Sequence, residues 1–315
     1  MIITILLFCL GLILVVKGGD LFVESSVNIA RTYHLPEIFI GATIVSIATT
    51  APEAIVSVTA ATAGHTTMSV GNAVGSIICN TGLVLGVTNI ISPSRIKGKF
   101  FRLKSLILLA VFLIFSTISY DGLITTKDSV ILIIILLGYI ILDTYILRYK
   151  NNQTSQYKRK IFNLRKKVKT IFFFITGIFS IIVGSNLLID NGIDLAKFIG
   201  VPESVISLSL IAFGTSLPEL TTALTALKKG HTSLSAGNIV GANILNVALV
   251  LGSSGMVSSL IIERQNLVLD FPVAFLMLLI LTIPCLFKNK ISRFQSISLL
   301  ILYALYICIL YRIHM

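Results

Sequence analysis

Thr49-Thr50-Ala51-Pro52-Glu53 is a short polar stretch inside an apolar segment, and it returns further along the chain as Thr215-Ser216-Leu217-Pro218-Glu219. The wider blocks, residues 41–86 and 207–252, align at a constant offset of 166 residues without a gap, and 19 of their 46 positions are identical. This agreement indicates one unit present twice. A glutamate that follows a proline in each copy of a membrane-embedded repeat is typical of the midplane ion site of a transporter.

The composition predicts an all-α, polytopic membrane protein. Of the 315 residues, 55% are hydrophobic and 12% charged, with a mean hydropathy of +0.97, whereas soluble domains are about 25% charged. Spanning the hydrocarbon takes about 20 apolar residues in a helix. Ten such spans lie near residues 2–30, 38–62, 67–91, 103–120, 128–148, 171–193, 203–227, 233–260, 267–286 and 294–312.

The first span is expected to be a helix of the repeat and not a signal peptide. It has no basic amino-terminal region and no clear small-residue cleavage site. The offset of 166 residues also continues into it, at Gly18/Gly184 and Ala30/Ala196. Five helices per half is an odd number, so the second copy enters the membrane from the opposite side. We therefore expect a first repeat at residues 1–149, a basic linker at 150–170 and a second, inverted repeat at 171–315.

The distribution of lysine and arginine supports this topology, because cytoplasmic loops hold most of these residues. Of the 25 lysines and arginines, 20 lie in the loops after the first, third, fifth, seventh and ninth spans. This count includes Arg102 and Lys104 with the loop after the third span. Both termini are then outside and the linker is cytoplasmic. The net charge of +12 is interpreted as orientation signals and contacts to anionic lipid. No nucleic-acid partner is expected.

Other motifs argue against an enzyme. Cys9, Cys79, Cys285 and Cys308 all fall in apolar spans without paired spacing, so neither disulfides nor a zinc site is predicted. Phosphate-binding loops and hydrolase or metalloprotease motifs are absent from the sequence. No cofactor is expected, and the chemistry must come from the repeated core.

The repeated core is rich in oxygen ligands. Pro52 and Pro218 cannot donate the helical hydrogen bond to the carbonyls four residues before them, so backbone oxygens are freed beside the glutamates. Hydroxyls on the same helical face add to them, from Thr49, Thr50, Thr215 and Ser216. Two such half-sites suit a hard cation, and calcium or sodium fits the ligand set better than magnesium.

Simpler interpretations of these residues remain open. A single membrane glutamate is often a hydrogen-bonded packing residue, but two at equivalent positions favour a site. Asn80 and Asn246 are either ligands or interhelical hydrogen-bonding groups, and the repeat favours the site. His65 and His231 are interpreted as turn residues, and no role is assigned to Asp143.

The two blocks resemble the alpha-1 and alpha-2 repeats of the cation/calcium exchanger superfamily, most closely its prokaryotic sodium/calcium exchangers. The family pattern GTSxPE and GNxxGSNxxN stands in the second copy at residues 214–219 and 237–246. The resemblance implies a prokaryotic inner membrane and implies that Glu53 and Glu219 bind Ca²⁺ and Na⁺ in turn, with oxygens of Thr49 and Thr215. It also implies ligands from Thr50, Ser216, Ser76, Asn80 and Asn246 and from the carbonyls of Ser46 and Ala212.

Several positions depart from the family pattern. Ala48, Thr50 and Ile77 stand where the family has glycine, serine and asparagine. Ala242 replaces a serine that lends a hydroxyl to a sodium site in relatives, so the number of ions per cycle is open. Asn246 is aspartate in some potassium-dependent relatives, which argues against potassium co-transport.

We therefore expect an antiporter that exchanges Na⁺ for Ca²⁺ by alternating access. Proton/cation exchange at the same glutamates is the alternative within transport. A cation channel is the alternative from another class, but one chain supplies both half-sites, which favours a carrier. A monomer in the lipid bilayer is expected.

Overall fold

A computed structural model describes residues 2–32, 37–94, 99–153, 164–198, 214, 216–288 and 290–314. In the first half these form α1 (Ile2–Thr32), α2 (Glu37–Ile40), η1 (Gly41–Val45), α3 (Ser46–Thr62), α4 (Thr66–Cys79), η2 (Asn80–Val84), α5 (Leu85–Ile91), α6 (Lys99–Ile118), β1 (Leu123–Ile124) and α7 (Thr126–Gln153). The second half holds α8 (Leu164–Phe198), α11 (Leu217–Lys228), α12 (Thr232–Leu245), η4 (Asn246–Leu251), α13 (Gly252–Val257), β2 (Leu260–Ile261), η5 (Asn266–Asp270), α14 (Phe271–Phe287) and α15 (Arg293–His314). The η segments are π-helical.

The predicted membrane fold is confirmed. Eight helical stretches are long and apolar enough to span a bilayer, and they match eight of the ten predicted spans. The sixth predicted span is α8, which carries an apolar stretch at Val168–Gly184. Of the seventh, the structure describes residue 214 and the part from Ser216 onward, which includes α11. Helices suit this setting because each satisfies its own backbone hydrogen bonds in lipid.

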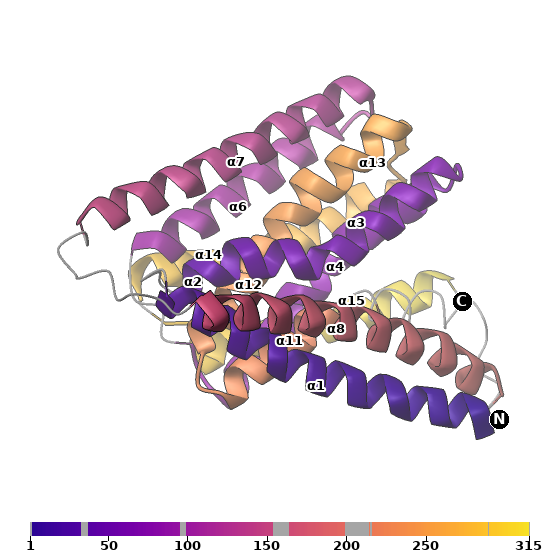
Figure 1. Ribbon diagram of the computed structural model, residues 1–315. Helices are drawn as coiled ribbons and strands as arrows, with labels where there is room; N and C mark the ends of the chain where they lie inside the picture. The colour runs from indigo at the N-terminus through magenta and orange to yellow at the C-terminus, as the bar shows by residue number, and fades with distance from the viewer. Residues whose placement is uncertain are drawn as a thin grey trace.

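The inverted relation of the halves is visible in α1 and α8, which run antiparallel along one edge of the molecule (Figure 1). Their backbones touch at glycines. A Cβ on Gly177 would lie 2.7 Å from the Phe22 amide nitrogen, and one on Gly184 would lie 2.9 Å from the Gly11 carbonyl oxygen. Small residues allow such close approach of membrane helices. Gly11 of α1 and Gly177 of α8 differ by the repeat offset. Equivalent residues of the two halves therefore take part in these contacts, each against the other helix.

The centre of the bundle is built from α3, α4, α11 and α12, which pack against one another. Figure 1 shows α12 in the middle, with α6 and α7 along the edge opposite α1 and α8. The largest apolar cluster joins α4, α6, α12 and α14 through residues such as Ile77, Phe112, Ile239 and Met277. This packing fixes the helices that carry the repeated motifs.

Two local features recur at equivalent positions of the halves. Gly64 and Gly230 end α3 and α11 with φ of +87° and +80°, a conformation that favours glycine. The next residues, His65 and His231, donate backbone hydrogen bonds to Ala60 and Ala226 at 2.9 and 2.7 Å. The interpretation of both histidines as turn residues is confirmed. The segments η2 and η4 also begin at equivalent residues, Asn80 and Asn246.

Some expectations need correction. Lys104, counted above with the loop residues, lies inside α6 and is 1% exposed. The proline motifs also differ in local structure, because Pro52 lies within α3 whereas Pro218 lies in the first turn of α11. A pair of two-residue strands, β1 and β2, joins the loops after α6 and α13, which the helical pattern did not predict. Helical structure reaches into both ends of the expected linker, to Gln153 and from Leu164.

Candidate cation site

Glu53 of α3 and Glu219 of α11 meet in the interior of the bundle. Both side chains are 0% exposed, and their carboxyl groups are close enough to interact with each other. Among the described residues, none of their four oxygen atoms accepts a hydrogen bond of good geometry, although the hydroxyls of Thr49 and Thr50 and the two carboxyl groups themselves lie within interacting distance. Buried polar groups are nearly always paired, so this arrangement is typical of a site that binds a cation or a proton.

The same lack of partners extends to the neighbouring side chains of both repeats. Each of these residues is at most 1% exposed. Among residues 2–314 as far as they are described, the following side-chain atoms have no hydrogen-bond partner: Thr50 Oγ1, Ser76 Oγ, Ser216 Oγ, Asn80 Oδ1, and both Asn246 Oδ1 and Nδ2. All but one of these atoms are oxygens. Together with the glutamates they supply carboxylate, hydroxyl and amide oxygens from α3, α4, η2, η4 and α11 with its N-cap residue.

Thr49 is oriented by its neighbours. Its hydroxyl lies 3.3 Å from Asn238 Oδ1 and 3.4 Å from the Ser46 carbonyl oxygen, either of which accepts its proton. The Ser46 hydroxyl donates to the Thr43 carbonyl at 3.0 Å. The carbonyl of Ser46 is therefore the part of that residue that faces Thr49, one turn along the same helix.

The π-helical segments contribute to the geometry at Asn80 and Asn246. A π-helical turn changes which backbone groups pair, and such turns are common at functional sites. Asn80 and Asn246 occupy the first position of η2 and η4, and both are fully buried. The extra residue in each turn re-aims the side chains that follow it.

The described predicted site residues lie within these packed central helices. Ser46, Thr49, Thr50, Glu53, Ser76, Asn80, Ser216, Glu219 and Asn246 are all buried. Thr215 and Ala212 lie outside the described residues.

A second layer of asparagines was not predicted as part of the site. Asn238 accepts from Thr49, and Asn72, its equivalent in the first repeat, donates to the Glu53 carbonyl at 3.4 Å and to Ser57 Oγ at 2.8 Å. Asn243 accepts from the Asn80 amide at 3.4 Å and donates to Thr81 Oγ1 at 2.8 Å. The identity of Asn72 and Asn238 in the two copies is a signal that could have indicated the first pair.

The ligand set defines the chemistry. No group of three or more histidine, cysteine, aspartate or glutamate side chains occurs among the described residues, so the acidic part consists of two carboxylates. Oxygen-only ligands of this kind suit hard cations such as Ca²⁺ and Na⁺ rather than soft metals. Two buried carboxylates repel each other unless a cation lies between them or one of them binds a proton.

The fold and the site define a class: a secondary cation transporter, with one buried site at the junction of two inverted membrane repeats. Comparison with known proteins gives the family. The sodium/calcium exchanger protein family matches residues 3–145 and 169–312. The chain therefore belongs to this family.

Individual relatives agree along almost the whole chain. An uncharacterized membrane protein of Methanocaldococcus jannaschii is 34% identical, covering 94% of each chain. The inner membrane protein YrbG of Escherichia coli is 31% identical, over 90% of this chain and 89% of that protein. The sodium/calcium exchanger MaX1 of Methanosarcina acetivorans is 27% identical over 99% of both chains. A solved structure of the sodium-calcium exchanger NCX_Mj superposes with a TM-score of 0.86 at 34% identity, covering 98% of both chains.

Proposed function

We propose that this protein exchanges Na⁺ for Ca²⁺ across a membrane by alternating access, with both ions competing for one site between Glu53 and Glu219. The observation that carries the proposal is the pair of fully buried carboxyl groups that accept no hydrogen bond of good geometry from the described residues. Membership of the sodium/calcium exchanger family supports the choice of ions.

The proposed ligands combine both repeats. Glu53 and Glu219 supply the charge, and neutral oxygens of Thr49, Thr50, Ser76, Asn80, Ser216 and Asn246 complete the site, with the carbonyls of Ser46 and Ala212 and the oxygens of Thr215. Ca²⁺ takes about 6–8 such ligands. One Ca²⁺ neutralises the two carboxylates, so the same site takes Na⁺ only after Ca²⁺ has left. This exclusion couples the two gradients.

The test is Ca²⁺ uptake into proteoliposomes driven by an outward Na⁺ gradient. Glu53→Gln and Glu219→Gln each remove one negative charge with little change of shape, and we expect uptake to fall to the level of empty vesicles. Glu263→Gln is the matched control, because Glu263 is exposed and outside the site. Wild-type uptake in either site variant would refute the proposed site.

The driving ion is tested with the same vesicles. A Na⁺ gradient at equal pH should drive uptake, and a pH gradient without Na⁺ should not. Uptake driven by the pH gradient alone would replace sodium with protons as the exchanged ion. Flux that does not saturate with Ca²⁺ would instead favour a channel.

We also infer the arrangement of the chain in the membrane. Residues 1–149 and 171–315 are proposed as the two repeats, joined by a cytoplasmic linker at 150–170, with both termini outside and a monomer as the working unit. Without the buried Lys104, 19 of the 25 basic residues are still expected on one side, which supports this orientation. The relative from E. coli is named an inner membrane protein, which supports a prokaryotic inner membrane.

A further inference from the structure

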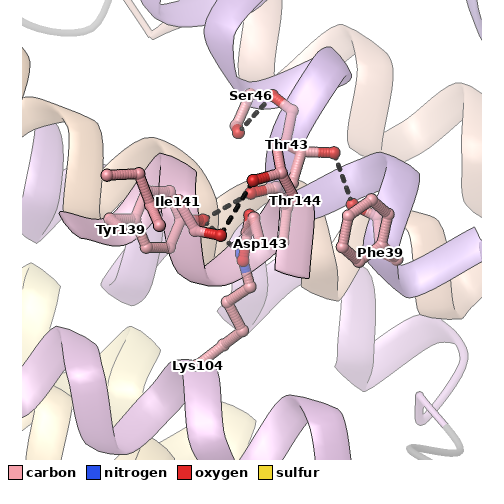
Figure 2. A network of polar contacts seen from close by, with 9 residues as sticks. Phe39, Thr43, Ser46, Lys104, Tyr139, Ile141, Asp143 and Thr144 are labelled. Atoms are coloured by element: carbon pink, nitrogen blue, oxygen red, sulfur yellow. Dashed lines mark hydrogen bonds and ion pairs between the residues drawn. The ribbon is translucent and has the colours of Figure 1, made fainter. Parts of the chain in front are cut away.

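Lys104 and Asp143 form an ion pair in the interior of the membrane domain, away from the carboxyl pair. Lys104 of α6 is 1% exposed and Asp143 of α7 is 4% exposed, and the Lys104 ammonium contacts Asp143 Oδ2 (Figure 2). Ionisable residues inside membrane helices are costly and are kept mainly for function. The exchange chemistry proposed above uses neither residue.

The ammonium group also reaches Tyr139. Lys104 Nζ donates to the Tyr139 hydroxyl at 2.7 Å and lies 4.0 Å from the centre of its ring. The rings of Phe100 and Phe39 lie 5.3 and 5.9 Å from the same nitrogen. Aromatic faces attract a cation strongly when it is desolvated, so the position of Lys104 is fixed from several sides.

Tyr139 also bonds to a third helical segment, η1, in addition to its contact with Lys104. Its hydroxyl donates to the Ala42 carbonyl at 2.6 Å. Ala42 belongs to η1, the π-helical segment between α2 and α3, and α3 carries Glu53. The Ser46 amide donates to the carbonyls of Gly41 and Thr43. It does not donate to the carbonyl of Ala42 between them, and the Tyr139 hydroxyl donates to that carbonyl instead. The polar link therefore coincides with the irregular turn.

The linked segment is also pressed against α12. A Cβ on Gly41 would lie 2.3 Å from the Leu234 carbonyl oxygen, and one on Gly241 would lie 2.7 Å from the Ala42 carbonyl oxygen. This contact lies toward the end of the bundle where α6 begins and α7 ends. The backbones of η1 and α12 are therefore in close contact at this end.

A direct electrostatic effect of Lys104 on the ions is small. Ala42 precedes Glu53 by eleven residues, which is about 16 Å along a helix, and the ammonium is already neutralised by Asp143. Ala42, Ser46, Thr49 and Glu53 do share one helical face. A mechanical link to this face is the effect that the geometry allows.

We propose that Lys104, Asp143 and Tyr139 form a latch that holds η1 against α12 and keeps the site closed toward the linker end. Tyr139 and Lys104 are then positioning residues that act through the Ala42 carbonyl. Release of the Tyr139–Ala42 hydrogen bond accompanies opening to that side. The proposal rests on the exchange function proposed above, but the latch itself is testable without transport.

The test uses Tyr139→Phe, which removes only the hydroxyl. Loss of one hydrogen bond shifts an equilibrium by about 3- to 10-fold. We expect the apparent KM for Ca²⁺ presented on the linker side to fall by that factor, because more protein is open to that side. The KM on the other side should not fall. Tyr145→Phe is the matched control, since Tyr145 lies on the same helix and is 68% exposed.

A second measurement separates the latch from the exchange function. Hydrogen exchange of the backbone amides of residues 43–47 should be faster in Tyr139→Phe than in wild type, with no change in α15. An unchanged KM on both sides, or a reduced maximal rate alone, would mean that the tyrosine has only a structural role. Unchanged amide exchange in 43–47 overturns the latch even in a preparation that transports nothing.

Discussion

Glu53 and Glu219 illustrate how much of the site depends on single side chains. A buried carboxyl group that serves packing finds well-aligned hydrogen-bond donors, yet among the described residues only the hydroxyls of Thr49 and Thr50 come near Glu219, and no hydrogen bond of good geometry is made to either glutamate. The atoms around them are mainly acceptors or hydroxyls whose protons can turn away. We therefore expect these oxygens to bind a cation, because unpaired buried polar groups are costly.

Thr49 provides a test of the neutral ligands. Thr49→Val keeps the shape of the side chain but removes the hydroxyl that lies between Asn238 and Ser46. We expect the KM for Ca²⁺ in Na⁺-driven uptake to rise about tenfold, because a hydrogen bond or ligand of this kind contributes about 1–2 kcal/mol.

Thr62→Val is the control for this change. Thr62 lies at the exposed end of the same helix and bonds only locally, to the Val58 carbonyl at 2.8 Å. Its KM should match wild type. Equal KM values in both variants would remove Thr49 from the site.

Among the helices, the antiparallel pair α1 and α8 depends on glycine. The Cβ of any other residue at position 177 would lie 2.7 Å from the backbone of Phe22. The backbones must then separate, because neither has a flexible side chain at the contact that could move. We expect this pair to slide during alternating access, so a wider spacing between the two helices should also affect exchange.

Gly177→Ala is expected to destabilise the protein and slow exchange. Overpacking of this kind costs about 1–3 kcal/mol, which lowers the melting temperature by several degrees. Thermal unfolding in detergent and Na⁺-driven Ca²⁺ uptake measure the two effects.

Gly192→Ala is the matched control on the same helix. There the nearest atom to an added Cβ, on Phe8, is 3.7 Å away, an ordinary contact. Its melting temperature should equal that of wild type. If Gly177→Ala also behaved like wild type, tight packing of α1 on α8 would not be needed for exchange.

At the scale of the whole molecule, the sequence also predicts one orientation of the protein in the membrane. Because most lysines and arginines lie on one side, both termini are expected outside the cytoplasm. A peptide tag at the carboxyl terminus should be removed by protease added to intact spheroplasts, whereas a tag inserted near residue 158 should be protected. The opposite pattern would reverse the assignment of sides. It would also reverse the direction from which the latch is expected to open.

Much of this was predictable from the sequence, because the bilayer permits few structures. Length and hydropathy define helices, since backbone groups in lipid must pair within a segment, and a gapless repeat with five spans per copy requires inversion. The motif around each glutamate likewise indicated buried polar residues of the central helices, such as Thr49, Ser76 and Asn246. These are local or periodic properties, which the order of residues records directly.

Tertiary structure alone decided which distant residues meet. Lys104 was taken for a loop residue and Asp143 had no role, because the sequence does not show that α6 and α7 place them face to face. The π-helical turns and the asparagine layer depend in the same way on packing between helices. A buried charge becomes acceptable only when its partner is in place, and that partner lies 39 residues away along the chain.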